Sequence, residues 1–448
     1  MSAQKLPHRP HSVTLDKNKC VGCTLCLKRC PTEAIRVHSG RAHIIDNRCI
    51  DCGECIRVCP HHAKIANTNP LAAINQFKYK IALPAPALYG QFKNLPSVGS
   101  VTHGLHMMGF DYVFDVARGA DIATIAVRKL LEDPDCPKPL ISSSCPAVVR
   151  LIQTRFPELI DNVATIKSPM EIAAIEARRE FCEKHNVDPE DVGCFFITPC
   201  AAKMTAIRNP IGHEKSAVNG AISFLDVYGL LSSQMKKSGL KPQVPGEEVR
   251  LRATSFGLGW ARTGGEATAL GTGNAGNALA VDGIEHVAKV LEQIENNRLQ
   301  DLVFFEGLSC IGGCVGGPLV FENGFISRNR IRILTRSLPS QSSEAFLSEE
   351  EYERVEAHVH LDKRIEPINV LQLDDNLQIA LEKMDQVEAI RQRLPDLDCG
   401  SCGSPSCQAL AEDIVQGYAS ELDCLLLLKE RVRQLAEQMV NMSETTRR

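Results

Sequence analysis

Two copies of one cysteine pattern, C-x2-C-x2-C-x3-C-P, constrain the fold of this chain more than any other feature. They read CVGCTLCLKRCP at residues 20–31 and CIDCGECIRVCP at residues 49–60, and they align cysteine for cysteine. Three thiolates of each run can reach one 4Fe-4S cubane, while the fourth, one turn further on, points to the neighbouring cluster. The spacing therefore predicts two 4Fe-4S clusters with crossed ligand sets: Cys20, Cys23, Cys26 and Cys59 for the first, and Cys49, Cys52, Cys55 and Cys30 for the second. Zinc is the alternative, but its sites use paired C-x2-C motifs instead of this tandem run.

The cysteine count bears on the compartment and on the partners that we expect. Nineteen of the 448 residues are cysteine, and the opening sequence MSAQKLPHRPH lacks the apolar segment of an export signal. We therefore expect a cytoplasmic protein whose thiols stay reduced and act as ligands. No stretch of the sequence approaches the ~18 apolar residues of a membrane helix. Fifty Lys and Arg against 54 Asp and Glu, with no basic block, argue against nucleic acid and leave small molecules, electrons or proteins as partners.

The cysteines fall into three groups, and these groups predict three domains. Eight lie in the N-terminal runs, seven are scattered through the middle of the chain, and four lie close to the C-terminus. A polar, proline-containing stretch at 67–76 separates the first two groups, and the second boundary is expected somewhere within 340–395. The predicted domains are 1–76, 77–375 and 385–448.

The middle of the chain alternates apolar, β-rich runs with helical patterns, which predicts an α/β domain with largely parallel sheets. Ligand sites in open α/β sheets gather beyond the carboxyl ends of the strands. Three of the runs end in a cysteine, so we expect Cys145, Cys200 and Cys310 to converge, with Cys314 four residues further on. Four thiolates at one place suit another iron–sulfur cluster. The alternative is that buried cysteines pack as small hydrophobes, which is our interpretation of two others, Cys182 and Cys194.

Longer motifs resemble those of a known family. Residues 12–66 resemble a bacterial two-cluster ferredoxin. The segments SSSCPAVV (142–149), TPCAAKMTA (198–206) and EGLSCIGGCVGGP (306–318) resemble, in their usual order, the three signature motifs of the iron-only, or FeFe, hydrogenases, which usually carry such a ferredoxin upstream. The resemblance implies an α/β and α+β multidomain protein with a ferredoxin-like domain and an α/β hydrogenase domain.

The resemblance also implies a six-iron cofactor, the H-cluster, in which one cysteine sulfur links a 4Fe-4S cubane to a two-iron unit carrying CO, CN and a bridging dithiolate amine. By the same motifs, Lys203 donates to a cyanide ligand, a role that suits an ammonium group. The alternative for Lys203 is a solvated helix residue. Glu306 is expected to orient groups around the cofactor. The cysteines carried over as ligands are Cys145, Cys200 and Cys310 for the cubane and Cys314 for the bridge.

The chain departs from the pattern of catalytic family members along the proton path. Those members have two adjacent cysteines in the first motif, and the earlier one, which passes protons, is replaced here by Ser144. A thiol has a pKa of about 8.5, whereas an alcohol is far less acidic and relays protons only through hydrogen bonds. Cys136 offers another proton route, with an ordinary cysteine near the surface as the alternative. Further replacements are Ala126 and Val127 for glutamates, and Thr198 and Leu308 for methionines.

The C-terminal sequence DCGSCGSPSCQALAEDIVQGYASELDC has the spacing C-x2-C-x4-C-x16-C. It resembles the small 4Fe-4S domain that accompanies sensory-type hydrogenases, with zinc as the alternative. The four expected ligands are Cys399, Cys402, Cys407 and Cys424. Apolar residues then recur at heptad spacing, which is typical of a coiled-coil seam and predicts a homodimer, while packing against the body of the chain is the alternative. The heptad residues are Leu425, Leu428, Val432, Leu435, Met439 and Met442.

Three hypotheses about function follow. The first is a slow, sensory-type FeFe hydrogenase that interconverts H2 with protons and electrons and signals through a kinase or phosphatase partner. The second is a metabolic hydrogenase coupled to ferredoxin, whose proton path uses Ser144 and water. The third is a non-catalytic iron–sulfur assembly or electron-transfer protein, which retention of Cys314 and Lys203 disfavours because both serve chiefly the two-iron unit.

Overall fold

The computed structural model describes residues 11–445 apart from 94, 96, 97, 238–253, 272–276, 337, 339–348, 371 and 375. In its N-terminal part, two one-turn helices, α1 (Leu25–Lys28) and α2 (Glu54–Arg57), begin at equivalent places in the two cysteine runs. The sequence repeat is therefore also a structural repeat. The strands of this part form two antiparallel pairs: β1 (Val13–Leu15) with β4 (Lys64–Ala66), and β2 (Ile35–His38) with β3 (Arg41–Ile44).

The central part contains two sheets, and every strand pair in them is parallel, as predicted. The first sheet has the order β6-β5-β8-β9 and consists of Tyr112–Val113, Tyr79–Pro84, Val192–Thr198 and Gly220–Ser223. The second has the order β10-β11-β7 and consists of Ala278–Asp282, Phe304–Leu308 and Leu140–Ile141. All residues of β8 are buried, as expected of a parallel strand covered on both faces.

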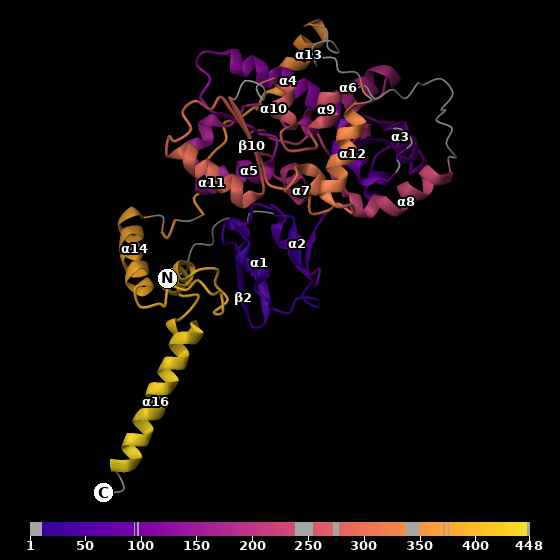
Figure 1. The fold of residues 1–448 in the computed structure, drawn as a ribbon. Helices are drawn as coiled ribbons and strands as arrows, with labels where there is room; N and C mark the ends of the chain where they lie inside the picture. The colour runs from indigo at the N-terminus through magenta and orange to yellow at the C-terminus, as the bar shows by residue number, and fades with distance from the viewer. Residues whose placement is uncertain are drawn as a thin grey trace.

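Helices surround the two sheets (Figure 1). The longest pair, α4 (Val116–Glu132) and α6 (Pro169–His185), pack against each other. Two further helices start directly after predicted ligand cysteines and so connect strand ends to the outer layer: α5 (Pro146–Arg155) and α7 (Ala201–Arg208). The remaining helices of this part are α3 (Val98–Met107), α8 (Phe224–Lys237), α9 (Ser255–Gly259), α10 (Gly265–Ala269), α11 (Ile284–Glu295), α12 (Gly324–Arg336) and α13 (Glu349–Val359).

Apolar residues of the strands and of these helices form the main cores. Ile81, Phe195 and Ile222 are buried in the core of the first sheet. Ile141 and Phe305 are buried in a core of the second sheet, which also receives Ile50 from the N-terminal part. The N-terminal part therefore packs on the central part through apolar contact, and one of its cysteine runs lies against the second sheet.

The C-terminal part is a small helical module followed by one long helix. Helices α14 (Leu377–Arg391) and α15 (Cys407–Val415) pack together, and the module lies against the N-terminal part. Helix α16 (Leu425–Thr445) extends away from the rest of the molecule (Figure 1). Its heptad side chains are exposed and do not pack against the body of the chain. Among the helices of the described residues, none combines the length and apolarity required to cross a bilayer.

Candidate functional site

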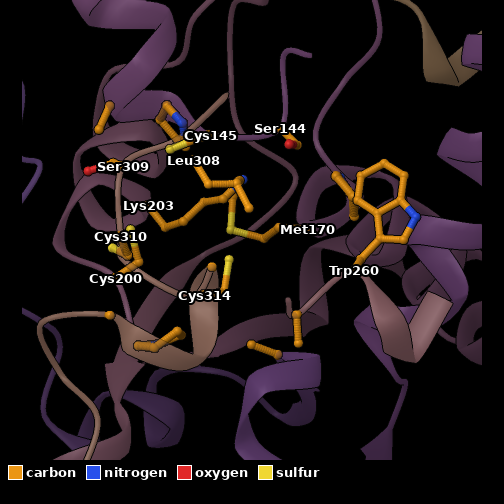
Figure 2. A pocket seen from close by; sticks show the side chains of 18 of the residues that line it. Ser144, Cys145, Met170, Cys200, Lys203, Trp260, Leu308, Ser309, Cys310 and Cys314 are labelled. Carbon is orange, nitrogen blue, oxygen red and sulfur yellow. The ribbon is translucent and has the colours of Figure 1, made fainter. Parts of the chain in front are cut away.

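The four central cysteines predicted as ligands line one cavity between the two sheets. Cys145 follows β7 and Cys310 follows β11 in the second sheet, whereas Cys200 follows β8 in the first sheet. Cys314 lies in the loop after Cys310, and all four line a cavity with about 950 Å³ of empty space, part of it open to solvent. Figure 2 shows their side chains around this cavity, with Ser144 and Trp260 to the other side. The strand ends thus converge as the sequence analysis expected.

Burial disfavours the charged thiolate form of these cysteines unless a cation binds them. Burial, followed by the neighbouring Cys310 and Cys145, raises the pKa of Cys200 to about 12. Burial also raises the pKa of Cys145, against opposing hydrogen bonds from the backbone. Metal coordination deprotonates a thiol outright and supplies the cationic partner that a group of buried sulfurs lacks. The sulfur set, the cavity and its apolar walls therefore fit an iron–sulfur group.

Lys203 extends from the first turn of α7 into the same cavity (Figure 2). Burial lowers the pKa of its ammonium group, while the nearby cysteines Cys200 and Cys314 raise it. Its side chain is partly buried and lines the cavity together with these sulfurs.

Ser144 belongs to a hydrogen-bonded group that includes a carboxylate which the sequence analysis missed. The Oγ atoms of Ser144 and Ser142 lie 2.8 Å apart, and both hydroxyls donate to Oε2 of Glu266, at 3.3 and 2.6 Å respectively. Glu266 is buried and lies on α10. Burial, followed by the charge of Glu306, raises the pKa of Glu266 to about 8. Ser144 and Glu266 both line the cavity, so the group places beside it a carboxyl that can exchange a proton near neutral pH.

Glu306 lies on β11 and holds the start of α10 in place. Its Oε1 accepts a hydrogen bond from the backbone N–H of Gly264, and its Oε2 accepts one from Ala267, both at 2.9 Å. Burial raises the pKa of Glu306 to about 7, opposed by these backbone N–H groups. Since Glu266 lies between the two donors in the sequence, Glu306 fixes the backbone that carries Glu266. An orienting role of Glu306 toward groups around a cofactor stays a prediction.

The other residues that differ from the family pattern do not supply an ionisable, proton-carrying group to the cavity. Ala126 and Val127 are buried in an apolar core on α4. Leu308 lines the cavity, and the Thr198 hydroxyl accepts a hydrogen bond from the Cys200 backbone N–H at 3.1 Å. Cys136 packs against the α4 core and is not among the residues that line the cavity. Of the two cysteines interpreted as packing residues, Cys194 is fully buried and Cys182 is partly buried.

The eight N-terminal cysteines form two separate groups in space. Cys59 lines one small cavity together with the first three cysteines of the other run. In the second group, burial is the main cause that raises the pKa of Cys52 and of Cys49. For both thiols, the nearby Cys30 and Cys55 raise the pKa further. This arrangement matches the crossed sets expected from the sequence: Cys20, Cys23, Cys26 and Cys59 in the first group, and Cys30, Cys49, Cys52 and Cys55 in the second.

The second N-terminal group lies against the central cavity. Cys52 itself lines that cavity, and its carbonyl accepts a hydrogen bond from the Ser309 hydroxyl at 3.4 Å. The Arg57 guanidinium donates to the Gly316 carbonyl at 3.1 Å. These contacts place one cysteine group beside the loop that carries Cys310.

The four C-terminal cysteines also gather in one small module. Cys407 and Cys424 are buried in its core, with Cys402 packed against them. Burial raises the pKa of Cys402, and the nearby Cys424 and Cys399 act in the same direction. The Cys407 backbone N–H donates to Asp398 at 2.6 Å, which holds the loop on the first turn of α15. The fourth cysteine, Cys399, is exposed.

Three family models match this chain in the order of its three cysteine groups. Residues 78–318, more than half of the chain, match a family described as iron only hydrogenase large subunit, C-terminal domain. Residues 12–60 match a 4Fe-4S dicluster domain, and residues 394–426 match an Fe-S cluster family.

Curated relatives are similar to part of the chain. It is 35% identical over 217 residues to the periplasmic Fe hydrogenase large subunit of Nitratidesulfovibrio vulgaris, covering 44% of this chain and 51% of the relative. It is 27% identical over 232 residues to iron hydrogenase 1 of Clostridium pasteurianum, covering 45% and 40%. A cytosolic Fe-S cluster assembly factor of Yarrowia lipolytica is 26% identical over 148 residues, covering 31% and 30%. The chain thus spans about half or less of the length of each of these relatives.

Proposed function

The chain belongs to the iron-only hydrogenase family, and from this premise we propose that it interconverts H2 with protons and electrons at an H-cluster, slowly and in a sensory role. Similarity to the two hydrogenases supports a part in H2 metabolism in general terms. The observation that carries the finer proposal is the cavity itself: its sulfur and ammonium groups are those that the H-cluster requires, while a hydroxyl stands where a proton-carrying thiol is usual.

We assign roles to the cavity residues on the basis of their positions. When bound, the H-cluster would supply the iron centre at which H2 is split and the acceptor for its electrons. The Lys203 ammonium would donate to a cyanide ligand from its position inside the cavity. The residues that would hold the cofactor are Cys145, Cys200 and Cys310 at the cubane and Cys314 at the bridge to the two-iron unit.

Protons would reach the cavity through hydroxyl groups. Glu266 would hold the proton, because its pKa of about 8 allows both protonation states near neutral pH. Ser142 and Ser144 would relay it by exchanging hydrogen bonds, since an alcohol does not ionise in this range. Transfer through a hydroxyl, which does not ionise near neutral pH, is slower than transfer through an ionisable thiol, and this supports a low turnover.

A second candidate is a non-catalytic role in iron–sulfur assembly. The similarity to the Yarrowia lipolytica assembly factor favours it. Lys203 argues for the hydrogenase, because its ammonium group in the cavity would serve the two-iron unit, whereas Cys314 would equally complete the four ligands of a plain cubane. A metabolic, ferredoxin-linked hydrogenase is the third candidate and differs from the first in turnover.

The partners and the domain division are part of the same proposal. Electrons would be exchanged with a redox protein such as a ferredoxin, and a signal would pass to a separate kinase or phosphatase. The three domains would be 1–76, 77–375 and 385–448, in a cytoplasmic protein. The exposed heptad face of α16 would pair with the same face of a second copy.

Infrared spectroscopy and turnover test the proposal together. Protein matured with the two-iron unit should show CO and CN stretching bands and evolve H2 slowly. Ser144→Cys should raise the H2 evolution rate at least about tenfold, because a thiol near the cavity is a competent acid–base group. Absence of the infrared bands would favour the assembly role. Fast turnover of the unaltered protein, with no gain from Ser144→Cys, would contradict the sensory role.

A further inference from the structure

The C-terminal module is joined to the N-terminal part by a close backbone contact. The backbone N–H of Val37, on β2, donates to the carbonyl of Gly403 at 2.8 Å. A Cβ atom on Gly403 would lie 1.9 Å from the Val37 carbonyl oxygen, and Gly403 has a φ of +87°. Only glycine fits this contact, so the loop between Cys402 and Cys407 is held at one position on β2.

A buried ion pair fixes the same contact. Arg36 of β2 donates from Nε to Asp413 Oδ2 at 2.5 Å and from Nη2 to Oδ1 at 3.1 Å, and the two side chains are 5% and 11% exposed. Asp413 also accepts a hydrogen bond from Ser404 in the module loop, at 3.1 Å. A two-point pair of this kind forms only in one relative orientation of its partners. The module is therefore docked in a defined orientation.

The docked face of the N-terminal part belongs to the first of its two cysteine groups. Val37 lines the small cavity of that group, which contains Cys23 and Cys59. Gly400, which lies between Cys399 and Cys402 in the sequence, faces Leu27 and Lys28 of α1. The first N-terminal group thus faces the C-terminal cysteines.

The two N-terminal groups lie next to each other, since Cys30 and Cys55 of the second group pack against the apolar core that contains Cys26 of the first. The second group in turn touches the central cavity through Cys52 and Ser309. These contacts link the central cavity to the second N-terminal group, that group to the first, and the first to the C-terminal module. The module also touches the chain beside the second group, through the Arg48–Glu412 pair at 3.3 Å and a hydrogen bond from Ser406 to Glu33 at 3.1 Å.

We infer that the C-terminal cysteine module is the outer end of the electron-transfer chain, and that the contact of Val37 and Arg36 with Gly403 and Asp413 is the junction through which electrons reach it. The inference rests on the proposed cluster ligands. Oxidation of one H2 would release two protons and two electrons, and each 4Fe-4S cluster would carry one electron at a time, between its 2+ and 1+ states. The cluster of the module would return to 2+ by reducing a one-electron acceptor protein of the ferredoxin class, so that two acceptor molecules are reduced for each H2.

Spin coupling between reduced clusters tests the junction without any H2 chemistry. The full chain is loaded with its 4Fe-4S clusters but not with the two-iron unit, reduced with dithionite, and examined by electron paramagnetic resonance. We expect the signal of the C-terminal cluster to be broadened by its reduced neighbour. Gly403→Ala should displace the module, because the added Cβ meets the Val37 carbonyl, and should abolish this broadening while iron content stays unchanged.

Two further variants keep the result interpretable. Arg36→Gln with Asp413→Asn removes both charges of the Arg36–Asp413 pair together and should also abolish the broadening, even if Gly403→Ala lowers the yield. Glu421→Gln breaks the exposed pair with Arg393 in the same module and should leave the spectrum unaltered. A C-terminal signal that is unbroadened in the unaltered protein would overturn the inference, as would broadening that survives both junction variants. Because the protein lacks the two-iron unit, neither result depends on whether the chain turns over H2.

Discussion

At the scale of single residues, Asp51 joins the N-terminal part to the central part through several hydrogen bonds. It lies between two cysteines of the second run, and its Oδ1 accepts hydrogen bonds from the backbone N–H groups of Ser12 and Val13. Its Oδ2 accepts from the Thr205 hydroxyl at 2.8 Å and from Arg150 at 3.4 Å. Those two residues lie on α7 and α5, the helices that follow Cys200 and Cys145. One carboxylate thus holds a cysteine run against the supports of two cavity cysteines.

Asp51→Asn is expected to lower the free energy of unfolding by about 3–5 kcal/mol, because it leaves the fully buried Arg150 guanidinium without its carboxylate. Urea denaturation of the cluster-loaded chain, followed by iron–sulfur absorbance and by far-ultraviolet circular dichroism, measures the change. The matched control is Asp161→Asn, which breaks an exposed pair with Arg364 and should alter stability little. Equal effects of the two substitutions would contradict the role given to Asp51.

Glu266 gives the protein a pH-dependent stability. Its pKa is raised from an ordinary 4.5 to about 8, chiefly by burial. Between those two pH values the folded chain keeps a proton that the unfolded chain releases, so stability falls as the pH rises, by up to about 1.4 kcal/mol per pH unit. Glu306, whose pKa is raised to about 7, acts in the same direction.

Glu266→Gln is therefore expected to make the free energy of unfolding fall less steeply between about pH 6 and pH 8. Urea titrations at several pH values measure the slope, and Glu158→Gln, on the exposed surface, serves as the control. If the slope of Glu266→Gln equals that of the unaltered chain, Glu266 does not hold its proton in this range.

At the scale of elements, the parallel strands and their ends were predictable from the sequence, whereas the division of the strands between two sheets was not. Apolar runs ending in Cys145, Cys200 and Cys310 predicted parallel strands with a site at their carboxyl ends, and the structure confirms the strands and their convergence. That β7 pairs in one sheet and β8 in another depends on long-range packing, on which an apolar run carries no information. The site lies between the sheets for this reason.

The sequence did not point to Glu266, because the helix that carries it is too short to show helical periodicity. Helix α10 has five residues, GEATA, in a glycine-rich segment, and helical periodicity needs a window of about 11–18 residues. Ser142 was passed over as part of the first motif. Ser142 and Glu266 come into hydrogen-bonding contact because Glu306 and the second sheet hold α10 next to the first motif. The residue types alone did not indicate that α10 lies close to this motif.

Helix α16 carries a testable prediction of its own. Leu428 and Leu435 occupy d positions of the heptads, with Val432 at an a position, a combination that favours parallel two-stranded coils. In a single chain these side chains are 38–57% exposed. Leu428→Lys with Leu435→Lys should halve the mass measured by sedimentation equilibrium. Glu437→Lys, off the apolar face, should leave the mass unchanged, and a monomeric unaltered chain would rule out the pairing.

At the scale of the whole molecule, stability is divided unequally between parts that depend on clusters and parts that do not. Among the described residues, the core of the N-terminal part consists of six buried residues, and two of these are the ligand candidates Cys20 and Cys26. The C-terminal core has seven, including Cys407 and Cys424. The central part buries both faces of its first sheet and needs no sulfur for most of its core. Apolar cores of this size seldom fold unless a bound metal or a covalent crosslink stabilises them.

Removal of iron should therefore unfold the two ends of the chain before the middle. After treatment with a chelator under anaerobic conditions, limited proteolysis is expected to cut first within residues 12–66 and 394–426, while a fragment containing residues 78–318 persists. The buried Asp51–Arg150 pair adds to this expectation, because unfolding of the N-terminal part removes Asp51 and leaves a buried guanidinium in the central part without its carboxylate. Asp51→Asn with Arg150→Met, which removes both charges, should lengthen the lifetime of the central fragment in the iron-free protein. Simultaneous cleavage of all three regions would show instead that the clusters hold the central sheets together as well.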